Sequence, residues 1–180
     1  MGAAMVLPRL LERMADRSVM LMGAQGLVVV ALVMGALLAF GGLPGWAVFL
    51  LVWAMIGFSY ASVLTPSGRL LRRSAHAEDR PGVFAAQFAL SHACWLLTYP
   101  AAGWAAQGFG MGGALFLLGL VALVGVVVAR AVWPAGLPQE VEHEHLDLPP
   151  DHPHLRAHGG RRHAHVFVID DAHRVWPTQG

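Results

Sequence analysis

Histidines gather at the C-terminal end of this 180-residue chain, where eight of its ten histidines lie. The spacing His-x-His occurs three times there, and acidic residues are interspersed among the imidazoles. Imidazole nitrogens beside carboxylate oxygens suit divalent nickel, cobalt, zinc or copper. We therefore predict a metal site that draws its ligands from His143, His145, His152, His154, His158, His163, His165 and His173.

The same segment permits a second interpretation. It contains no cysteine and no His-Glu-x-x-His sequence, so it has neither the thiolates that would select zinc tightly nor the pattern of a catalytic zinc site. Pro149, Pro150 and Pro153 favour an extended chain. We expect a charged, mostly disordered cytoplasmic tail, in which residues 166–169 form a short strand or a docking segment.

A second candidate site lies within an apolar stretch, where an ionisable residue marks a functional position by default. His92 is the only side chain in such a stretch that titrates near neutrality, and the polar candidates that accompany it are Ser91, Gln87 and Gln25. His92 either lines a substrate path or relays protons, or it is a neutral histidine that hydrogen-bonds to a neighbouring helix. The sequence favours the neutral histidine, because no carboxylate accompanies His92 in the stretch to form a proton relay.

Four long uncharged stretches must hold these residues in place, at about 19–40, 46–63, 82–106 and 109–129. About 20 apolar residues in a helix cross the hydrocarbon of a bilayer, and lipid admits only a backbone whose hydrogen bonds are satisfied internally. With 56% hydrophobic and 13% charged residues, the chain has too little polar surface for a soluble helical core. We predict an all-α membrane protein with four transmembrane helices in two antiparallel hairpins. Small residues within the stretches, such as Ala31, Gly35, Gly112 and Gly119, permit close helix packing.

The basic residues, all of them arginine, stay on alternate connections. They precede the first stretch, occupy the connection after the second and follow the fourth, whereas the other two connections carry no charge. The positive-inside rule then places both termini in the cytoplasm, and we expect the bacterial inner membrane. The predicted parts are a connector with the end of a preceding helix (1–18), a four-helix region (19–134) and a histidine-rich cytoplasmic tail (135–180).

The segment that leads into the first stretch, residues 8–17, resembles the cytoplasmic signature G-x-x-x-D-R-x-G-R-[RK] of the major facilitator superfamily. Glu12 stands at its acidic position, Arg13 at the basic position that follows, and Arg17 at the last basic position. The segment departs from the signature at Pro8, Ala15 and Asp16.

Two further segments extend this resemblance. Residues 65–81 are similar to the connector between the tenth and eleventh helices of bacterial members, and residues 83–104 to the eleventh helix. The resemblance covers about residues 1–134, and it implies helices nine to twelve of a twelve-helix transporter, truncated at the gene or by a misassigned start. It also implies ion pairs that latch a cytoplasmic gate, for which the candidates are Glu12, Arg13, Arg17, Arg69, Asp79 and Arg80. Alternatively, these arginines only set the topology.

The leading functional interpretation is part of a secondary transporter that moves a small molecule or ion across the membrane, with the lipid bilayer and the remaining transporter helices as partners. The alternative is a small stand-alone membrane protein, or a metal exporter fragment, whose tail binds nickel, cobalt or zinc. We expect no enzymatic activity, because no nucleophile with a base and no phosphate-binding loop is present. We expect no nucleic-acid partner, because the arginines build no continuous basic patch.

Overall fold

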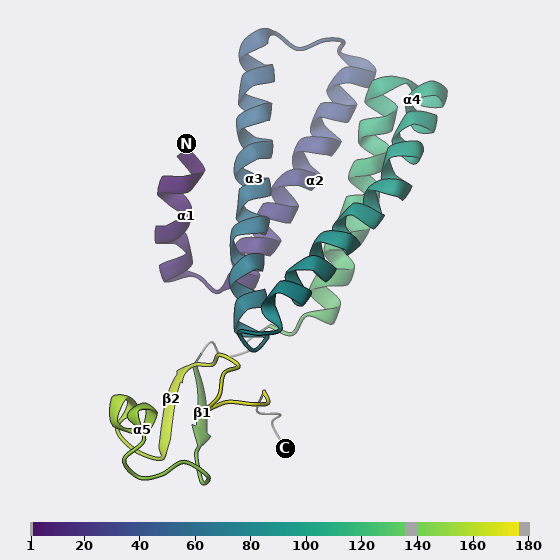
Figure 1. Cartoon of the computed structure of the whole chain (residues 1–180). Coiled ribbons are helices and arrows are strands. Elements are labelled where there is room, and N and C mark those ends of the chain that lie inside the picture. Colours follow the sequence, from purple (N-terminus) through teal and green to yellow (C-terminus); the bar gives the residue numbers. More distant parts are fainter. Residues whose placement is uncertain (1, 136–139, 177–180) are drawn as a thin grey trace. The chain divides into compact units, whose positions relative to one another are not determined.

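The computed structural model describes residues 2–135 and 140–176 of the chain (Figure 1). Its elements, in chain order, are α1 (Gly2–Arg13), α2 (Asp16–Phe40), α3 (Trp46–Arg73), α4 (Arg80–Val132), β1 (Glu140–Glu144), α5 (Pro153–His158) and β2 (Arg162–Val166). They form two compact units. The first comprises Met1–Gly68 and Gln87–Pro134, and the second comprises Arg69–Ala86 and Ala135–Gly180.

Three of the described helices, α2, α3 and α4, are long and apolar enough to cross a membrane. The 53 residues of α4 correspond to the third and fourth predicted stretches together. A straight helix of this length would measure about 80 Å, far more than the roughly 30 Å of hydrocarbon. Gly110 interrupts the helix with φ 72° and ψ 174°, a conformation that glycine adopts without steric cost.

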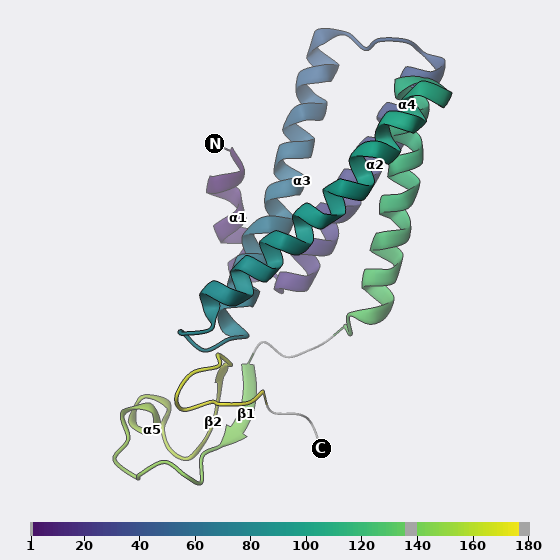
Figure 2. The ribbon, with the colours of Figure 1, turned by 45° about the vertical axis from the view of Figure 1, so that its right-hand side comes forward.

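Figures 1 and 2 show α4 as two legs that fold back on each other. The bend at Gly110 lies close to the uncharged connection that the sequence predicts near residues 107–108. The structure thus has three long apolar elements where the sequence predicts four helices, because the last two are joined through this bend. The number of membrane crossings and the two hairpins stay predictions.

Glycines allow α2 to pack closely against its neighbours. A Cβ atom at Gly23 would lie 2.6 Å from the carbonyl oxygen of Ser59 in α3. A Cβ atom at Gly35 would lie 2.6 Å from the backbone nitrogen of Phe116, in the second leg of α4. Gly119 in the same leg faces Ala31 of α2. The small residues at 31, 35 and 119 therefore serve the close helix packing that the sequence indicates.

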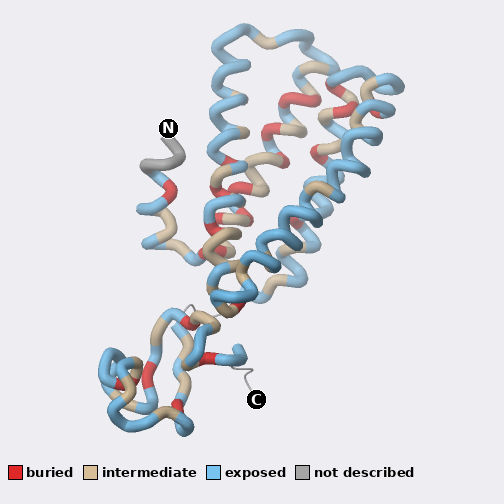
Figure 3. The backbone as a smooth tube through the Cα atoms, in the orientation of Figure 1, coloured by how far each residue is buried: buried red, intermediate tan, exposed pale blue. Residues whose placement is uncertain are grey.

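The other helical surfaces of this unit are apolar and exposed. Figure 3 shows buried positions along α2, whereas much of α3 and of the first leg of α4 is exposed. The exposed large side chains include Trp46, Trp53, Phe88, Leu96, Leu97, Tyr99 and Trp104. Water would not favour an apolar surface of this extent, so a lipid bilayer or other apolar helices must surround it.

The second unit contains a β-hairpin. β1 and β2 pair antiparallel, with Glu140 opposite Val166 and Glu144 opposite Arg162. The connection between them carries α5, which ends at Gly159 in the left-handed conformation, with φ 84°. The expectation of a mostly disordered tail is therefore not confirmed for residues 140–176. Pro149 and Pro150 lie in a loop and Pro153 opens α5, where proline is compatible with a helix start.

Candidate functional site

The strands bring four histidines of the tail to one face of the hairpin. Alternate residues of a strand point to the same face, so each His-x-His sequence presents two imidazoles side by side. His143 of β1 lies opposite His163 of β2, and Val141 lies opposite His165. His145 follows β1 directly, and its backbone nitrogen donates to the carbonyl oxygen of Arg161 at 3.0 Å. The ring centroids of His143 and His145 are 4.9 Å apart, and those of His163 and His165 are 5.2 Å apart.

Three more histidines complete this group from outside the strands. His154 and His158 are one turn apart on α5, and their ring centroids are 4.8 Å from each other. His173 lies in the loop after β2. We call these seven residues the histidine cluster: His143, His145, His154, His158, His163, His165 and His173. Two contacts within it join ring nitrogens directly, His154 Nε2 to His163 Nε2 at 2.9 Å and His173 Nε2 to His143 Nε2 at 3.0 Å.

Oxygen acceptors fix the orientation of four rings in the cluster. The Nδ1 atom of His143 lies 2.8 Å from the carbonyl oxygen of Val141, and that of His163 lies 2.7 Å from the carbonyl oxygen of Gly160. The Nδ1 atom of His165 lies 2.9 Å from the carbonyl oxygen of Val166. The Nδ1 atom of His173 lies 2.7 Å from a carboxylate oxygen of Asp170. An oxygen of this kind only accepts. Nδ1 therefore donates in each of the four contacts, and in a neutral ring Nε2 keeps its lone pair.

Burial and crowding favour the neutral form of His143, His145 and His154. Desolvation, reinforced by the neighbouring imidazoles, lowers the pKa of His145 and of His154 from 6.5 to about 4. Desolvation also lowers the pKa of His143, against the opposing effect of its hydrogen bond to Val141. For Asp170, burial acts to raise the pKa, but the hydrogen bonds and charge of His173 outweigh burial and lower it. Neutral imidazoles beside an ionised carboxylate are the forms that bind metal ions.

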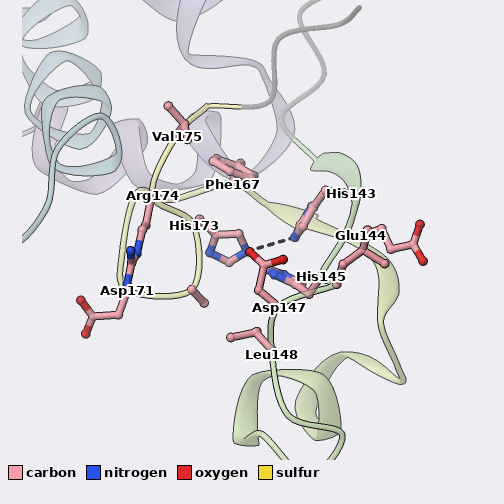
Figure 4. Close-up of a pocket in the computed structure, with 12 residues that line it drawn as sticks. His143, Glu144, His145, Asp147, Leu148, Phe167, Asp171, His173, Arg174 and Val175 are labelled. Atoms are coloured by element: carbon pink, nitrogen blue, oxygen red, sulfur yellow. Dashed lines mark hydrogen bonds between the residues drawn. The ribbon is translucent and has the colours of Figure 1, made fainter.

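Seven of the eight predicted metal ligands thus come together, and one does not. His152 caps the N-terminus of α5, where its Nδ1 accepts a hydrogen bond from the backbone nitrogen of His154 at 3.3 Å. The acidic residues mostly point elsewhere. Glu142 pairs with Arg162 at 2.8 Å, and the side chains of Glu144 and Asp171 point away from the cluster (Figure 4).

A cavity of about 580 Å³ opens beside the cluster, and His143, His145 and His173 line it together with Phe167 (Figure 4). Within the cluster, two overlapping groups of four histidines bring one nitrogen of each ring within 4.8 Å of the others. The first group is His143, His154, His165 and His173, and the second is His143, His145, His154 and His163. Either group has the donor set for one transition-metal ion.

Sequence reasoning did not name three residues that shape this site as parts of it. Asp170 orients His173, and the buried rings of Phe167 and His173 are in edge contact at 4.8 Å. Leu155 of α5 is buried. Two features of the sequence point to these residues: the spacing Asp170-x-x-His173, and apolar residues that stand alone in a polar tail. Neither feature identifies a site until the pairing of the strands is known.

The membrane candidates do not converge on one site. The Nδ1 atom of His92 lies 2.8 Å from the carbonyl oxygen of Phe88, on its own helix, and its ring stacks between Phe88 and Trp95. Ser91 lies beside it, with Oγ 3.4 Å from the same Nδ1. Gln87 is exposed on α4, whereas Gln25 is half-buried on α2. His92 therefore hydrogen-bonds within α4, and its role in a substrate path stays a prediction.

Two of the gate candidates, Arg17 and Arg80, bind backbone carbonyl oxygens. Arg17 donates from Nε to the carbonyl oxygen of Trp133 at 3.0 Å, so that it binds the C-terminal end of α4. Arg80 donates to the carbonyl oxygen of Ala75 at 3.3 Å. Glu12 and Arg13 are exposed at the end of α1, and Asp79 is exposed before α4. The sixth candidate, Arg69, is half-buried near the end of α3. The latch of ion pairs at the cytoplasmic gate stays a prediction. In the structure, Arg17 donates hydrogen bonds to backbone carbonyl oxygens.

Comparison with known proteins identifies the membrane part. A family model described as Major Facilitator Superfamily matches residues 1–169. No curated protein matches the chain, and no solved structure does. Members of this family are transporters, which agrees with the expectation of a non-enzyme and does not favour the alternative of a stand-alone membrane protein or metal exporter fragment. With its long apolar helices and this match over most of its length, the chain belongs to the major facilitator superfamily.

Proposed function

We propose that the chain functions as part of a secondary transporter that moves a small solute across a bacterial inner membrane. The family match over residues 1–169 is the observation that carries this proposal. Three long apolar helices in the described part of the chain support it. Transporters of this superfamily consist of two halves that rock around a site near the middle of the bilayer.

The exposed faces of the helices support a role within a larger bundle. α3 and the first leg of α4 present large apolar side chains, and the polar side chains of Gln87, Ser91 and His92 lie among them. Lipid disfavours polar groups of this kind. We propose that further transporter helices cover this face, and that His92 and Ser91 then border the path of the solute.

The arginines support a cytoplasmic location for both termini. Arg9, Arg13 and Arg17 precede or begin α2, and Arg130 lies in the last turn of α4. Arg69, Arg72 and Arg73 end α3. Arginine accumulates on the cytoplasmic side of inner-membrane proteins. A reporter that is active only in the cytoplasm should therefore be active when it is fused after Gly180. A reporter that is active only in the periplasm should be inactive at the same position.

Solute accumulation in a strain that lacks the gene tests the transport proposal. The strain is compared with the same strain carrying the wild-type gene, across a panel of amino acids, sugars, organic acids, drugs and divalent metals. We expect one chemical class to change in accumulation, and the wild-type gene to restore it. His92→Ala should fail to restore it, whereas Cys94→Ala, two residues away on the exposed surface, should restore it.

Two outcomes would contradict parts of this proposal. If no class of solute changes in accumulation, transport is wrong. If His92→Ala restores accumulation as well as Cys94→Ala does, the chain transports but His92 does not border the path. Immunodetection of each variant in the membrane fraction shows that a failure to restore does not come from loss of the protein.

A further inference from the structure

We propose that the histidine cluster binds one divalent transition-metal ion per chain through the Nε2 atoms of His143, His154, His165 and His173. The proposal concerns the tail alone, and it holds whether or not the membrane helices transport a solute. Nickel, cobalt, zinc and copper are the chemical class, because imidazole suits these ions and magnesium or calcium require oxygen ligands.

The orientation of the rings is the first argument. Three of the four proposed ligands, His143, His165 and His173, have Nδ1 held by an oxygen acceptor, so that Nε2 faces the cluster. Protein metal sites fix their histidines in this way, through a carbonyl or carboxylate on the distal nitrogen. For His173 the acceptor is the carboxylate of Asp170, 2.7 Å from Nδ1, whereas for His143 and His165 it is a neutral backbone carbonyl. A charged tail without a site has no need for such consistent orientation.

The distances are the second argument. One nitrogen of each of the four rings lies within 4.8 Å of the others, and the Nε2 atoms of His143 and His173 are already 3.0 Å apart. A tetrahedral ion with metal–nitrogen bonds near 2.0–2.1 Å needs nitrogens about 3.3 Å apart. Small ring rotations therefore suffice to build the site from the described positions.

An unsatisfied nitrogen is the third argument. The Nε2 atom of His165 is buried and has no hydrogen-bond partner among the described residues, and the same holds for Nε2 of His145, which belongs to the second group of four. A buried polar atom without a partner costs about 1–3 kcal/mol, so a folded protein usually provides one. A metal ion at the centre of the four proposed ligands would be the partner of His165. It would also replace the two close contacts between imidazole nitrogens.

The composition of the tail's core is the fourth argument. Five side chains are buried among residues 140–176, and three of them are His145, His163 and His173. The other two, Leu155 and Phe167, are the only buried apolar side chains of that described segment. The unit that contains this segment also includes Arg69–Ala86, and units below about 70–80 residues usually supplement their apolar core with disulfides, a metal or oligomerisation. The segment has no cysteine, which leaves a metal ion as the internal cross-link its own residues can make.

The overlap of the two groups of four sets the stoichiometry. Both groups use His143 and His154, and a neutral imidazole offers one lone pair to one ion. The first group is preferred because three of its members have an oriented Nδ1, whereas the second has two, His143 and His163. The second group provides a neighbouring position to which the ion can shift.

Calorimetric titration of the full chain in detergent with nickel, zinc or cobalt tests the site, and magnesium serves as the negative control. We expect one ion per chain. His173→Ala and His165→Ala each remove a ligand, and should weaken binding at least tenfold. Asp170→Asn should weaken it about 10–100-fold, as loss of an orienting partner does in other metal sites.

His152→Asn and His76→Ala are the matched controls, since both histidines lie outside the cluster and asparagine keeps an acceptor at the N-cap of α5. Both should bind as the wild type does. Equal losses for His152→Asn and His173→Ala would mean diffuse binding to a histidine-rich chain, and would overturn the proposal. Millimolar affinity for every ion would overturn it too. Bound cobalt gives a second readout that does not depend on affinity, because direct coordination adds a contact shift to the ring protons of each ligand, and the four ligand histidines should show the largest shifts.

Discussion

The membrane helices and the tail are built on opposite principles. In the helices, α2 packs against its neighbours at glycines where even a Cβ atom would collide with backbone, at Gly23 and Gly35 of α2 and at Gly112 of α4. The polar ring of His92 lies outside these contacts, beside the rings of Phe88 and Trp95. In the tail, polar rings occupy the centre. His145, His163 and His173 are buried, and apolar Leu146 and Val175 are exposed.

This contrast shows where chemistry is concentrated. A lipid-facing helix keeps its backbone satisfied without side chains, so its packing is decided by residue size. A tail of this length has few apolar residues to bury, and its stability then depends on the protonation or ligation of its polar centre. Conditions that alter imidazoles should change the tail and leave the helices intact, whereas changes of residue size should do the reverse.

Acidification should produce the largest difference between the two regions. In the metal-free protein, the pKa values of His145 and His154 are lowered to about 4 in the folded tail, from 6.5. Between these values the unfolded tail binds more protons than the folded tail, so stability falls as the pH falls. The contribution is fully present above about pH 6.5, and it is lost progressively as the pH approaches about 4.

Histidine proton signals, recorded in detergent with a chelator from pH 7.5 to pH 4, measure this loss. The dispersed ring signals of the tail should collapse toward random-coil positions, while far-ultraviolet circular dichroism of the helices stays constant. Neighbouring charges include His143, His163, His165 and His173, whose protonation adds repulsion in the same direction. A tail whose signals stay dispersed at pH 4.5 would contradict the imidazole-centred core.

A change of residue size in the helices comes next. Gly35→Leu places a side chain where a Cβ atom alone would lie 2.6 Å from the backbone nitrogen of Phe116. Overpacking of this kind costs about 1–3 kcal/mol, and more where backbone must move. Thermal unfolding in detergent should show a lower midpoint for Gly35→Leu. Gly125→Leu, at a position with open space around it, should unfold close to the wild type, and equal midpoints for both would contradict the packing argument.

Sequence reasoning succeeded where one physical rule decides the outcome. The long uncharged stretches predicted helices at about 19–40 and 46–63, because lipid allows a backbone no alternative to internal hydrogen bonds. The structure has helices there that extend further, at 16–40 and 46–73, into the charged connections. The resemblance in residues 8–17 led to the correct family, although three of its positions depart from the pattern. The bend of α4 was placed two or three residues early, because several glycines near it suit a turn and only Gly110 takes the positive φ.

The arrangement of the tail could not be obtained in this way. Three prolines suggested an extended chain, but proline position matters more than proline number, and Pro153 begins a helix. The three His-x-His sequences suit strands as well as coil. Their pairing depends on the turn at Gly159 and Gly160, both with positive φ, and on the burial of Leu155 and Phe167. These are long-range conditions, which a local pattern does not contain.

Arg17 offers a smaller test of the helical unit. Its guanidinium bonds to the carbonyl oxygens of Trp133 and Arg130, at 3.0 Å and 3.4 Å, at the end of α4 where carbonyls lack helical partners. Arg17→Gln should lower the free energy of unfolding by about 1–2 kcal/mol. Arg9→Gln, which alters an exposed arginine of α1, should have no effect. Equal values for the two variants, measured by chemical denaturation in detergent, would show that Arg17 only sets topology.

The smallest effect should come from the ion pair of the hairpin. Arg162 Nε lies 2.8 Å from Glu142 Oε1, but the two side chains are 71% and 61% exposed. The same contact raises the pKa of Arg162 through its hydrogen bond and the charge of Glu142. Water screens an exposed pair, so the coupling should be small and should weaken further as the salt concentration rises. A double-mutant cycle with Glu142→Gln and Arg162→Gln, read from the hairpin's ring signals at low and high salt, measures it. The imidazole core should contribute more to the stability of the tail than this ion pair does. A coupling energy larger than the loss of stability on acidification would contradict that order. A coupling energy that does not fall at high salt would contradict the assignment of an exposed, screened pair.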